Sequence, residues 1–232
     1  MPGSTYMLAV ERSTPVGSWA LFEGADFRLA RPLAASGPRS PGWITELLSE
    51  LARQGVAPQE VQQLVVGTGP GSFSGIRAAI ALLQGMALPQ GLPVYGLSSA
   101  AVLARQTALA VRHDTMAVVG DARRQRLWCA VFRLLPDGRL VEARTGRRPT
   151  HDGDDFCLVD EEHLSAVIPA DARVVTPEWE RLGERLTRML APGLLIPGPV
   201  APTATSLGAL LHVDREAARR DPVPVYLHPA VA

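Results

Sequence analysis

The sequence predicts an α/β fold of two lobes that meet near residue 110. Short apolar runs bounded by Gly, Pro and Asp alternate with amphipathic stretches, and the order of strands followed by helices occurs twice. We expect the first lobe over residues 1–110 and a smaller second lobe over residues 111–232. The chain has 232 residues, 47% of them hydrophobic, which is enough for a core in each lobe.

The first lobe opens with three predicted strands at residues 6–11, 18–24 and 26–32, joined by the turns STPVG and GAD. An antiparallel meander is the natural arrangement. Over residues 43–54 the apolar residues then recur with the period of an α-helix, and Gly55 ends this predicted helix. Four more elements complete the lobe, and they are a buried strand in QQLVVGTG, the helix that follows its glycine-rich loop, a strand in LPVYGLSS and a helix in SSAAVLARQTALAV.

The second lobe repeats this opening. TMAVVGDA is a predicted buried strand, LWCAVFRLL pairs with it, and PDG turns into RLVEAR. Helices follow, the last of them at about residues 203–213, which can pack back on the first lobe.

Composition excludes several classes of function. The 23 basic and 23 acidic residues cancel, so nothing in the net charge favours nucleic acid, and we interpret Arg123, Arg124 and Arg126 as a solvated face. The chain contains no lysine, which excludes a Walker-type phosphate lysine and a Schiff-base lysine. No apolar run is long enough to span a membrane, and we expect a cytoplasmic protein.

The two cysteines, Cys129 and Cys157, are too few and too far apart in the sequence for a disulfide framework or a zinc site. We therefore expect two buried small hydrophobic residues. None of the five histidines forms an H-x-x-x-H or H-E-x-x-H pattern, and no G-x-S-x-G elbow occurs. The sequence thus gives no metal site and no catalytic residue.

A glycine-rich loop, GTGPGSFSG, leads from a predicted strand directly into a helix. Its spacing is neither the G-x-G-x-x-G of dinucleotide-binding folds nor a P-loop. Gly69, Gly71 and Ser72 are candidates for binding a phosphate, with Ser72 as the helix N-cap. The alternative is that the glycines bring the helix tightly against a neighbouring strand or subunit.

The helix after this loop is apolar on nearly all sides, and no charged residue follows Arg77 before its end. Such a helix should be buried on both sides. Its second face is covered either by a partner protein or, equally well, by the first helix of the same lobe. Glu11 and Asp121 end the first strand of each lobe and are the acidic candidates for a cofactor site, although Glu11 with the cation of Arg12 beside it disfavours a metal–phosphate site.

A family resemblance is carried by GTGPGSFSGIRAAIALLQGMA together with LPVYGLSSAAVLA. These stretches resemble the signature of the TsaB family, also called YeaZ. Further matches are AVERST, VVGDARRQRLWCAVF and PVYLHP, so the resemblance covers most of the chain and is strongest over residues 67–104. It implies an actin-like ATPase fold (the ASKHA, ribonuclease H-like class), with two lobes that each hold a mixed sheet flanked by helices.

The resemblance also implies a function. Such a protein is a non-catalytic subunit that binds and activates the enzyme TsaD, together with the ATPase TsaE. The complex forms N6-threonylcarbamoyladenosine (t6A) at adenosine 37 of tRNAs that read ANN codons. The tRNA is contacted through the complex, the chain alone binds no cofactor, and ATP or ADP would sit at the complex interface. A homodimer is expected when TsaD is absent.

In that family the first two helices of the N-terminal lobe form the partner interface. Carried over to this chain, the expected interface residues are Trp43, Leu47, Leu51, Ser74, Ile76, Arg77, Ile80 and Leu83. Glu11 stands where the family has Asp, in keeping with lost catalysis. The alternatives are an active small-molecule kinase or ATPase of the same fold, and a glycoprotease, which the histidine spacing disfavours.

Overall fold

The computed structural model describes residues 5–33, 42–143 and 156–227, and it forms two compact units. The first unit combines residues 1–99 with residues 203–224, and the second combines residues 100–202 with residues 225–232. Among the helices that these ranges contain, none joins the length and the apolar character needed to cross a membrane.

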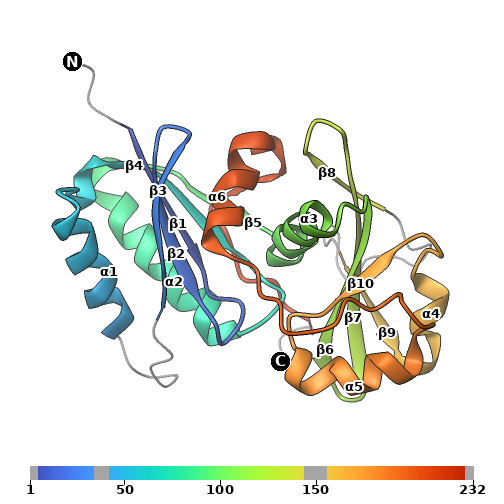
Figure 1. The fold of residues 1–232 in the computed structure, drawn as a ribbon. Coiled ribbons are helices and arrows are strands. Elements are labelled where there is room, and N and C mark those ends of the chain that lie inside the picture. Colours follow the sequence, from blue (N-terminus) through green and yellow to red (C-terminus); the bar gives the residue numbers. More distant parts are fainter. Residues whose placement is uncertain (1–4, 34–41, 144–155, 228–232) are drawn as a thin grey trace. The chain divides into compact units, whose positions relative to one another are not determined.

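The first unit is built on a six-stranded mixed sheet with the order β11-β5-β4-β1-β2-β3 (Figure 1). β1 pairs antiparallel with β2 and parallel with β4, so the predicted meander forms one side of the sheet. The elements of this unit are β1 (Tyr6–Glu11), β2 (Ser18–Glu23), β3 (Asp26–Pro32), α1 (Gly42–Arg53), β4 (Val61–Gly67), α2 (Phe73–Ala87), β5 (Val94–Leu97), α6 (Ala204–Val213) and β11 (Arg219–Arg220).

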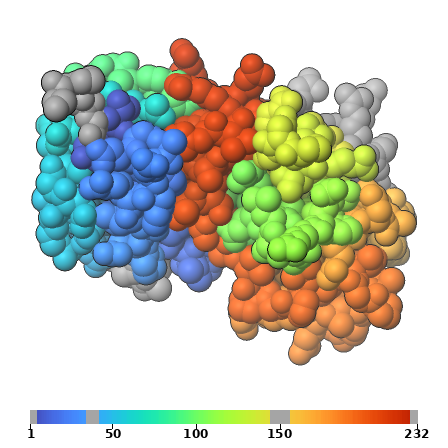
Figure 2. Space-filling model, turned by 45° about the horizontal axis from the view of Figure 1, so that its top comes forward, coloured from blue at the N-terminus to red at the C-terminus, as the bar shows by residue number. Residues whose placement is uncertain are grey.

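Helices cover both faces of this sheet (Figure 1). Leu8 and Val10 of β1 point to the face that carries α1 and α2, and all of these belong to one apolar core. Because side chains alternate along a strand, Met7 points to the other face, where α6 packs on β1, β2 and β4. Figure 2 shows α6, in orange-red, against the blue strands of the meander.

The second unit holds a five-stranded sheet with the order β10-β6-β7-β8, in which β9 also pairs with β7. Its elements are α3 (Ser99–Val111), β6 (Thr115–Arg123), β7 (Arg126–Leu134), β8 (Leu140–Glu142), β9 (Cys157–Asp160), α4 (Leu164–Val167), β10 (Arg173–Val175) and α5 (Trp179–Met189). One face of the sheet packs on α3, and the opposite face packs on α4 and α5.

The structure groups α3 with the second unit, whereas the boundary expected from the sequence, at residue 110, places this helix in the first lobe. Its apolar residues Leu103, Ala104 and Ala108 lie in the core formed by β6 and β7, so the helix groups with the second unit. Propensity and periodicity identify a helix, but they do not say which sheet it packs on.

The two cysteines are also placed differently from the sequence expectation. Both are buried, as expected, yet they are not far apart: β9 returns antiparallel to β7 with Cys129 and Cys157 as direct cross-strand partners. The 28-residue separation in the sequence concealed this pairing because it depends on a long-range strand register.

Candidate functional site

Glu11 ends β1 and is completely buried. Its Oε1 accepts a hydrogen bond from the backbone N–H of Ser13 at 2.7 Å, and its Oε2 accepts one from the hydroxyl of Ser99 at 2.9 Å. Burial raises the pKa of Glu11 above its ordinary value, against the opposing effect of these hydrogen bonds. The carboxyl group is therefore engaged within the chain.

The glycine loop also directs its backbone donors inward. The N–H of Gly69 donates to the hydroxyl of Ser99 at 3.1 Å, and the N–H of Ser72 donates to the carbonyl of Ser13 at 2.6 Å. Ser72 is the N-cap of α2, as predicted, and its hydroxyl accepts from the N–H of Gly75. These N–H groups are among those that could bind a phosphate at the start of α2, and here they donate within the chain.

The concave side of the loop is filled by the turn between β1 and β2. A Cβ atom on Gly67 would lie closer than 3.0 Å to the Glu11 carboxylate, and one on Gly75 would meet the carbonyl oxygen of Arg12 equally closely. Gly71, at φ 154°, would meet the carbonyl of Ser13. The structure therefore favours the second interpretation of the glycines, which is close approach between α2 and a neighbouring strand.

Arg12, next to Glu11, points toward α1. Its guanidinium carbon lies 4.6 Å from the centre of the Trp43 ring, a cation–π contact. Arg12 is the basic residue that follows β1 in the sequence, and its guanidinium group packs against the ring of Trp43.

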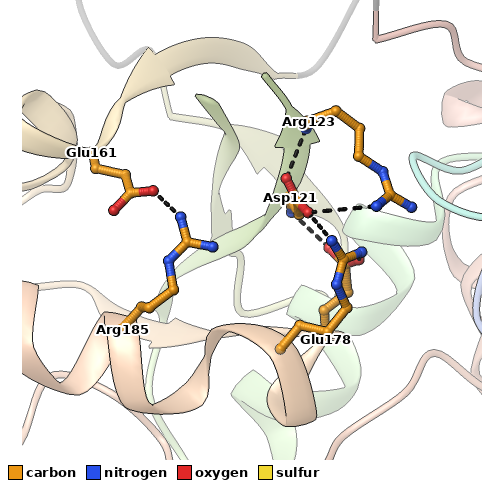
Figure 3. A network of polar contacts seen from close by, with 6 residues as sticks. Asp121, Arg123, Glu161, Glu178 and Arg185 are labelled. Atoms are coloured by element: carbon orange, nitrogen blue, oxygen red, sulfur yellow. Dashed lines mark hydrogen bonds and ion pairs between the residues drawn. The ribbon is translucent and has the colours of Figure 1, made fainter. Parts of the chain in front are cut away.

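Asp121, the acidic candidate of the second unit, belongs to a network of ion pairs (Figure 3). Its carboxylate accepts from the guanidinium of Arg181 and from the backbone N–H of Arg123, and its own N–H donates to Glu178 at 2.6 Å. Arg181 also pairs with Glu178, and a neighbouring pair joins Arg185 to Glu161. Arg123 has a side chain that is 70% exposed, as expected for a solvated face.

Within the ranges that the structure describes, no three His, Cys, Asp or Glu side chains lie close enough together to hold a metal ion. Glu11 and Asp121 belong to different units, and each is held by partners in its own unit.

The predicted partner residues divide into two groups. Ser74 and Arg77 are exposed on α2. The other six lie in the core of their own unit, because the apolar stripe of each helix is the one that packs on the sheet, and they are Trp43, Leu47, Leu51, Ile76, Ile80 and Leu83. For these six, the expectation of a partner-facing position is corrected.

Within the chain α2 is buried on one side only, so the first helix does not cover its second face, and cover by a partner protein stays a prediction. The outward face of α2 consists of Phe73, Ser74, Arg77, Ala81, Gln84 and Gly85, and the C-cap residue Leu88 continues it. Phe73 is 45% exposed and Leu88 is 81% exposed. The spacing of these residues is helical and complementary to that of the buried stripe, which is the signal that could have identified them.

Comparisons with known proteins bear on this arrangement. Residues 39–140 match the family model described as TsaD, tRNA N6-adenosine threonylcarbamoyltransferase. An uncharacterized protein of Mycobacterium tuberculosis is 37% identical over 128 residues, which are 54% of this chain and 58% of that protein. The tRNA threonylcarbamoyladenosine biosynthesis protein TsaB of Haemophilus influenzae is 31% identical over 123 residues, which are 53% of this chain and 51% of that protein. The chain thus matches little more than half the length of these relatives.

The fold itself is found among solved structures. YeaZ from Pseudomonas aeruginosa has a TM-score of 0.75 and 23% sequence identity, and the match covers 96% of this chain and 99% of that one. At this identity the likeness shows the fold alone. Two mixed sheets flanked by helices are the ASKHA-like architecture that the sequence predicts. The resemblance to the TsaB (YeaZ) family is confirmed, in sequence by the family model and the TsaB-named relatives and in fold by YeaZ.

Proposed function

We propose that this chain is a non-catalytic subunit that binds and activates a TsaD-like enzyme. The reaction is formation of the threonylcarbamoyl group on N6 of adenosine 37 in tRNAs that read ANN codons. The names of the TsaB relatives and of the matching family model support this process as the one in which the chain takes part. A TsaE-like ATPase completes the assembly, the tRNA is contacted through the complex, and the chain alone forms a homodimer.

The observation that carries the proposal is the outward face of α2. After Arg77 this face has no charged side chain up to the end of the helix, whereas a solvated helix normally presents charged residues to water. Phe73 and Leu88 offer exposed apolar surface at its two ends. Between them Ala81 and Gly85 leave little side-chain bulk, which allows a partner helix to approach closely.

The glycine loop and the two acidic candidates support a subunit without its own phosphate chemistry. Four backbone N–H groups at the loop and the start of α2 donate within the chain, those of Gly69, Ser72, Gly75 and Ile76. Glu11 is buried and hydrogen-bonded, and Asp121 is paired with arginines. The chain alone therefore binds no nucleotide in this proposal, and ATP or ADP belongs at the interface of the complex.

Co-purification with the TsaD-like enzyme of the same organism tests the proposal, with Ala81→Arg as the variant and Ala110→Arg as its matched control. Both alanines are exposed on helices, Ala81 on the proposed face and Ala110 on α3. A guanidinium desolvated without a partner at an interface should weaken binding by about a hundredfold. Ala110→Arg should bind and support t6A formation as the unchanged chain does.

Three outcomes would contradict the proposal. Equal binding by Ala81→Arg and Ala110→Arg would remove α2 from the interface. An unchanged chain that binds no TsaD-like enzyme would remove the subunit role. Turnover of ATP by the chain alone would favour the kinase alternative and a phosphate site at the glycine loop.

A further inference from the structure

Cys129 of β7 and Cys157 of β9 face each other across two antiparallel strands. Direct partners on such strands have Cα atoms about 4.5 Å or about 5.5 Å apart, depending on whether the pair is hydrogen-bonded. Both separations fall within the roughly 4.4–6.8 Å that a disulfide spans. The strand register therefore brings the two backbones into the Cα range of a disulfide, and a small local approach of the strands brings the Cβ atoms from about 4.5–5.5 Å to the roughly 3.5–4.5 Å that the bond requires.

The two side chains also point in the same direction. Cross-strand partners lie on one face of a sheet, and both cysteines belong to the apolar core that the sheet forms with α4 and α5. Burial raises the pKa of the Cys129 thiol, and its cross-strand partner Cys157 raises it further. Both residues remain as thiols in the structure.

We propose that Cys129 and Cys157 form a redox modification site, a dithiol that a peroxide converts reversibly into an intramolecular disulfide. The inference rests on the strand register and on the shared face, and it is independent of the proposed function.

The reaction balances with hydrogen peroxide as the oxidant. Both thiols are buried, Cys129 at 0% and Cys157 at 3% exposed, and we expect Cys157, the first residue of β9, to react first. Its thiolate attacks the O–O bond, giving a sulfenic acid and water. The sulfur of Cys129 then displaces hydroxide from the Cys157 sulfur, and the thiol proton leaves with the hydroxide as water. Two thiols and one peroxide give one disulfide and two waters, and a small dithiol reverses the reaction by exchange.

Oxidation would change the stability of the second unit. The disulfide closes a loop from residue 129 to residue 157, which contains β8, and it fixes β9 on β7. A loop of this length, closed without strain, should raise the melting temperature of the chain by about 5–10 °C.

The experiment treats the full chain with hydrogen peroxide, blocks remaining thiols with an alkylating agent and digests it with trypsin without reduction. Because the chain has no lysine, trypsin cuts only after arginine, and Cys129 falls in the peptide Leu127–Arg133. We expect this peptide to appear linked to the one that carries Cys157, to separate after reduction, and to accompany the rise in melting temperature. Cys157→Ala serves as the control and should show neither the link nor the rise.

Two results would overturn the inference. One is that both cysteines of the peroxide-treated chain are alkylated, as in the untreated chain. The other is that the cysteines are oxidised singly to sulfinic acids, or linked between two chains, with no link between Cys129 and Cys157 of one chain. Each of these readouts uses the unchanged protein, so neither depends on the folding of a variant.

Discussion

The hydroxyl of Ser99 donates a hydrogen bond to the carboxylate of Glu11 at 2.9 Å, across 88 residues of sequence. The same hydroxyl accepts from the N–H of Gly69 at 3.1 Å, and the N–H of Ser99 donates to the carbonyl of Gly69. One serine thus joins the end of β1, the glycine loop and the segment that follows β5. Glu11 and Gly69, two of the residues that the sequence suggests for a cofactor site, are thus linked to each other through Ser99.

The buried carboxyl of Glu11 makes stability depend on pH. Its folded-state pKa is raised above the ordinary value of 4.5, so the folded chain holds this proton more tightly than the unfolded chain does. Its favourable contribution is complete below pH 4.5 and is lost as pH rises through the folded-state pKa. We therefore expect Glu11→Gln, which cannot ionise, to gain stability relative to the unchanged chain over this rise in pH. Urea unfolding at a series of pH values from 4.5 upward measures the difference.

The opposite slope would refute this assignment. If the unchanged chain gained on Glu11→Gln as the pH rose, the hydrogen bonds from Ser13 and Ser99 would outweigh burial, and the pKa of Glu11 would be lowered.

Two glycines of α2 test why the loop is rich in glycine. A Cβ atom at Gly75 would collide with the backbone carbonyl of Arg12, which cannot move away without displacing the β1–β2 turn. We expect Gly75→Ala to lower the free energy of unfolding by about 2 kcal/mol or more. At Gly85 nothing lies within 4 Å of an added Cβ, so Gly85→Ala should raise the free energy of unfolding by about 0.5–1 kcal/mol through helix propensity. Denaturant titration of both variants measures these changes. Equal changes in the free energy of unfolding would mean that Gly75 is not required for close packing of α2 against the β1–β2 turn.

The sequence was sufficient for much of the fold because the patterns involved are local. The meander was predicted by its turn residues, α1 by the spacing of Trp43, Leu47 and Leu51, and the start of α2 by Ser72. The fold class followed from the family resemblance of the glycine loop. These features depend on neighbours within one turn or one hairpin.

The sequence did not predict which face of each helix packs on the sheet and which face is exposed. A stripe such as Ile76, Ile80 and Leu83 can pack on a sheet or on a partner with the same periodicity, and only the assembled sheet decides between them. The filling of the glycine loop by the β1–β2 turn, and the pairing of Cys129 with Cys157, both depend on contacts between distant segments. Local pattern contains no information on such registers.

The ion pairs around Asp121 should stabilise the second unit in proportion to their burial. The Asp121 side chain is only 10% exposed, so Arg181→Gln leaves a nearly buried carboxylate with a weaker set of partners. We expect a loss of about 1 kcal/mol in the free energy of unfolding at low salt, smaller at high salt. Arg139→Gln is the control, because Arg139 and its partner Asp137 are both about half exposed, and it should cause no measurable change. Equal losses in the two variants would indicate that burial of Asp121 adds nothing.

Substitution of two adjacent leucines of α1 distinguishes an effect on folding from an effect on partner binding. Leu47 is completely buried in the core, whereas Leu48, about 100° further round the helix, is 36% exposed. We expect Leu47→Ala to lower the free energy of unfolding by about 2–4 kcal/mol through loss of core packing and the cavity left behind, and Leu48→Ala to change it by less than about 0.5 kcal/mol.

If α1 joins α2 in the proposed interface, Leu48→Ala should weaken binding of a TsaD-like enzyme several-fold while the chain stays fully folded. Thermal unfolding and titration calorimetry on the same samples give both quantities. A Leu48→Ala chain that binds as tightly as the unchanged one would confine the interface to α2, and a Leu47→Ala chain of unchanged stability would contradict the packing of α1 on the sheet.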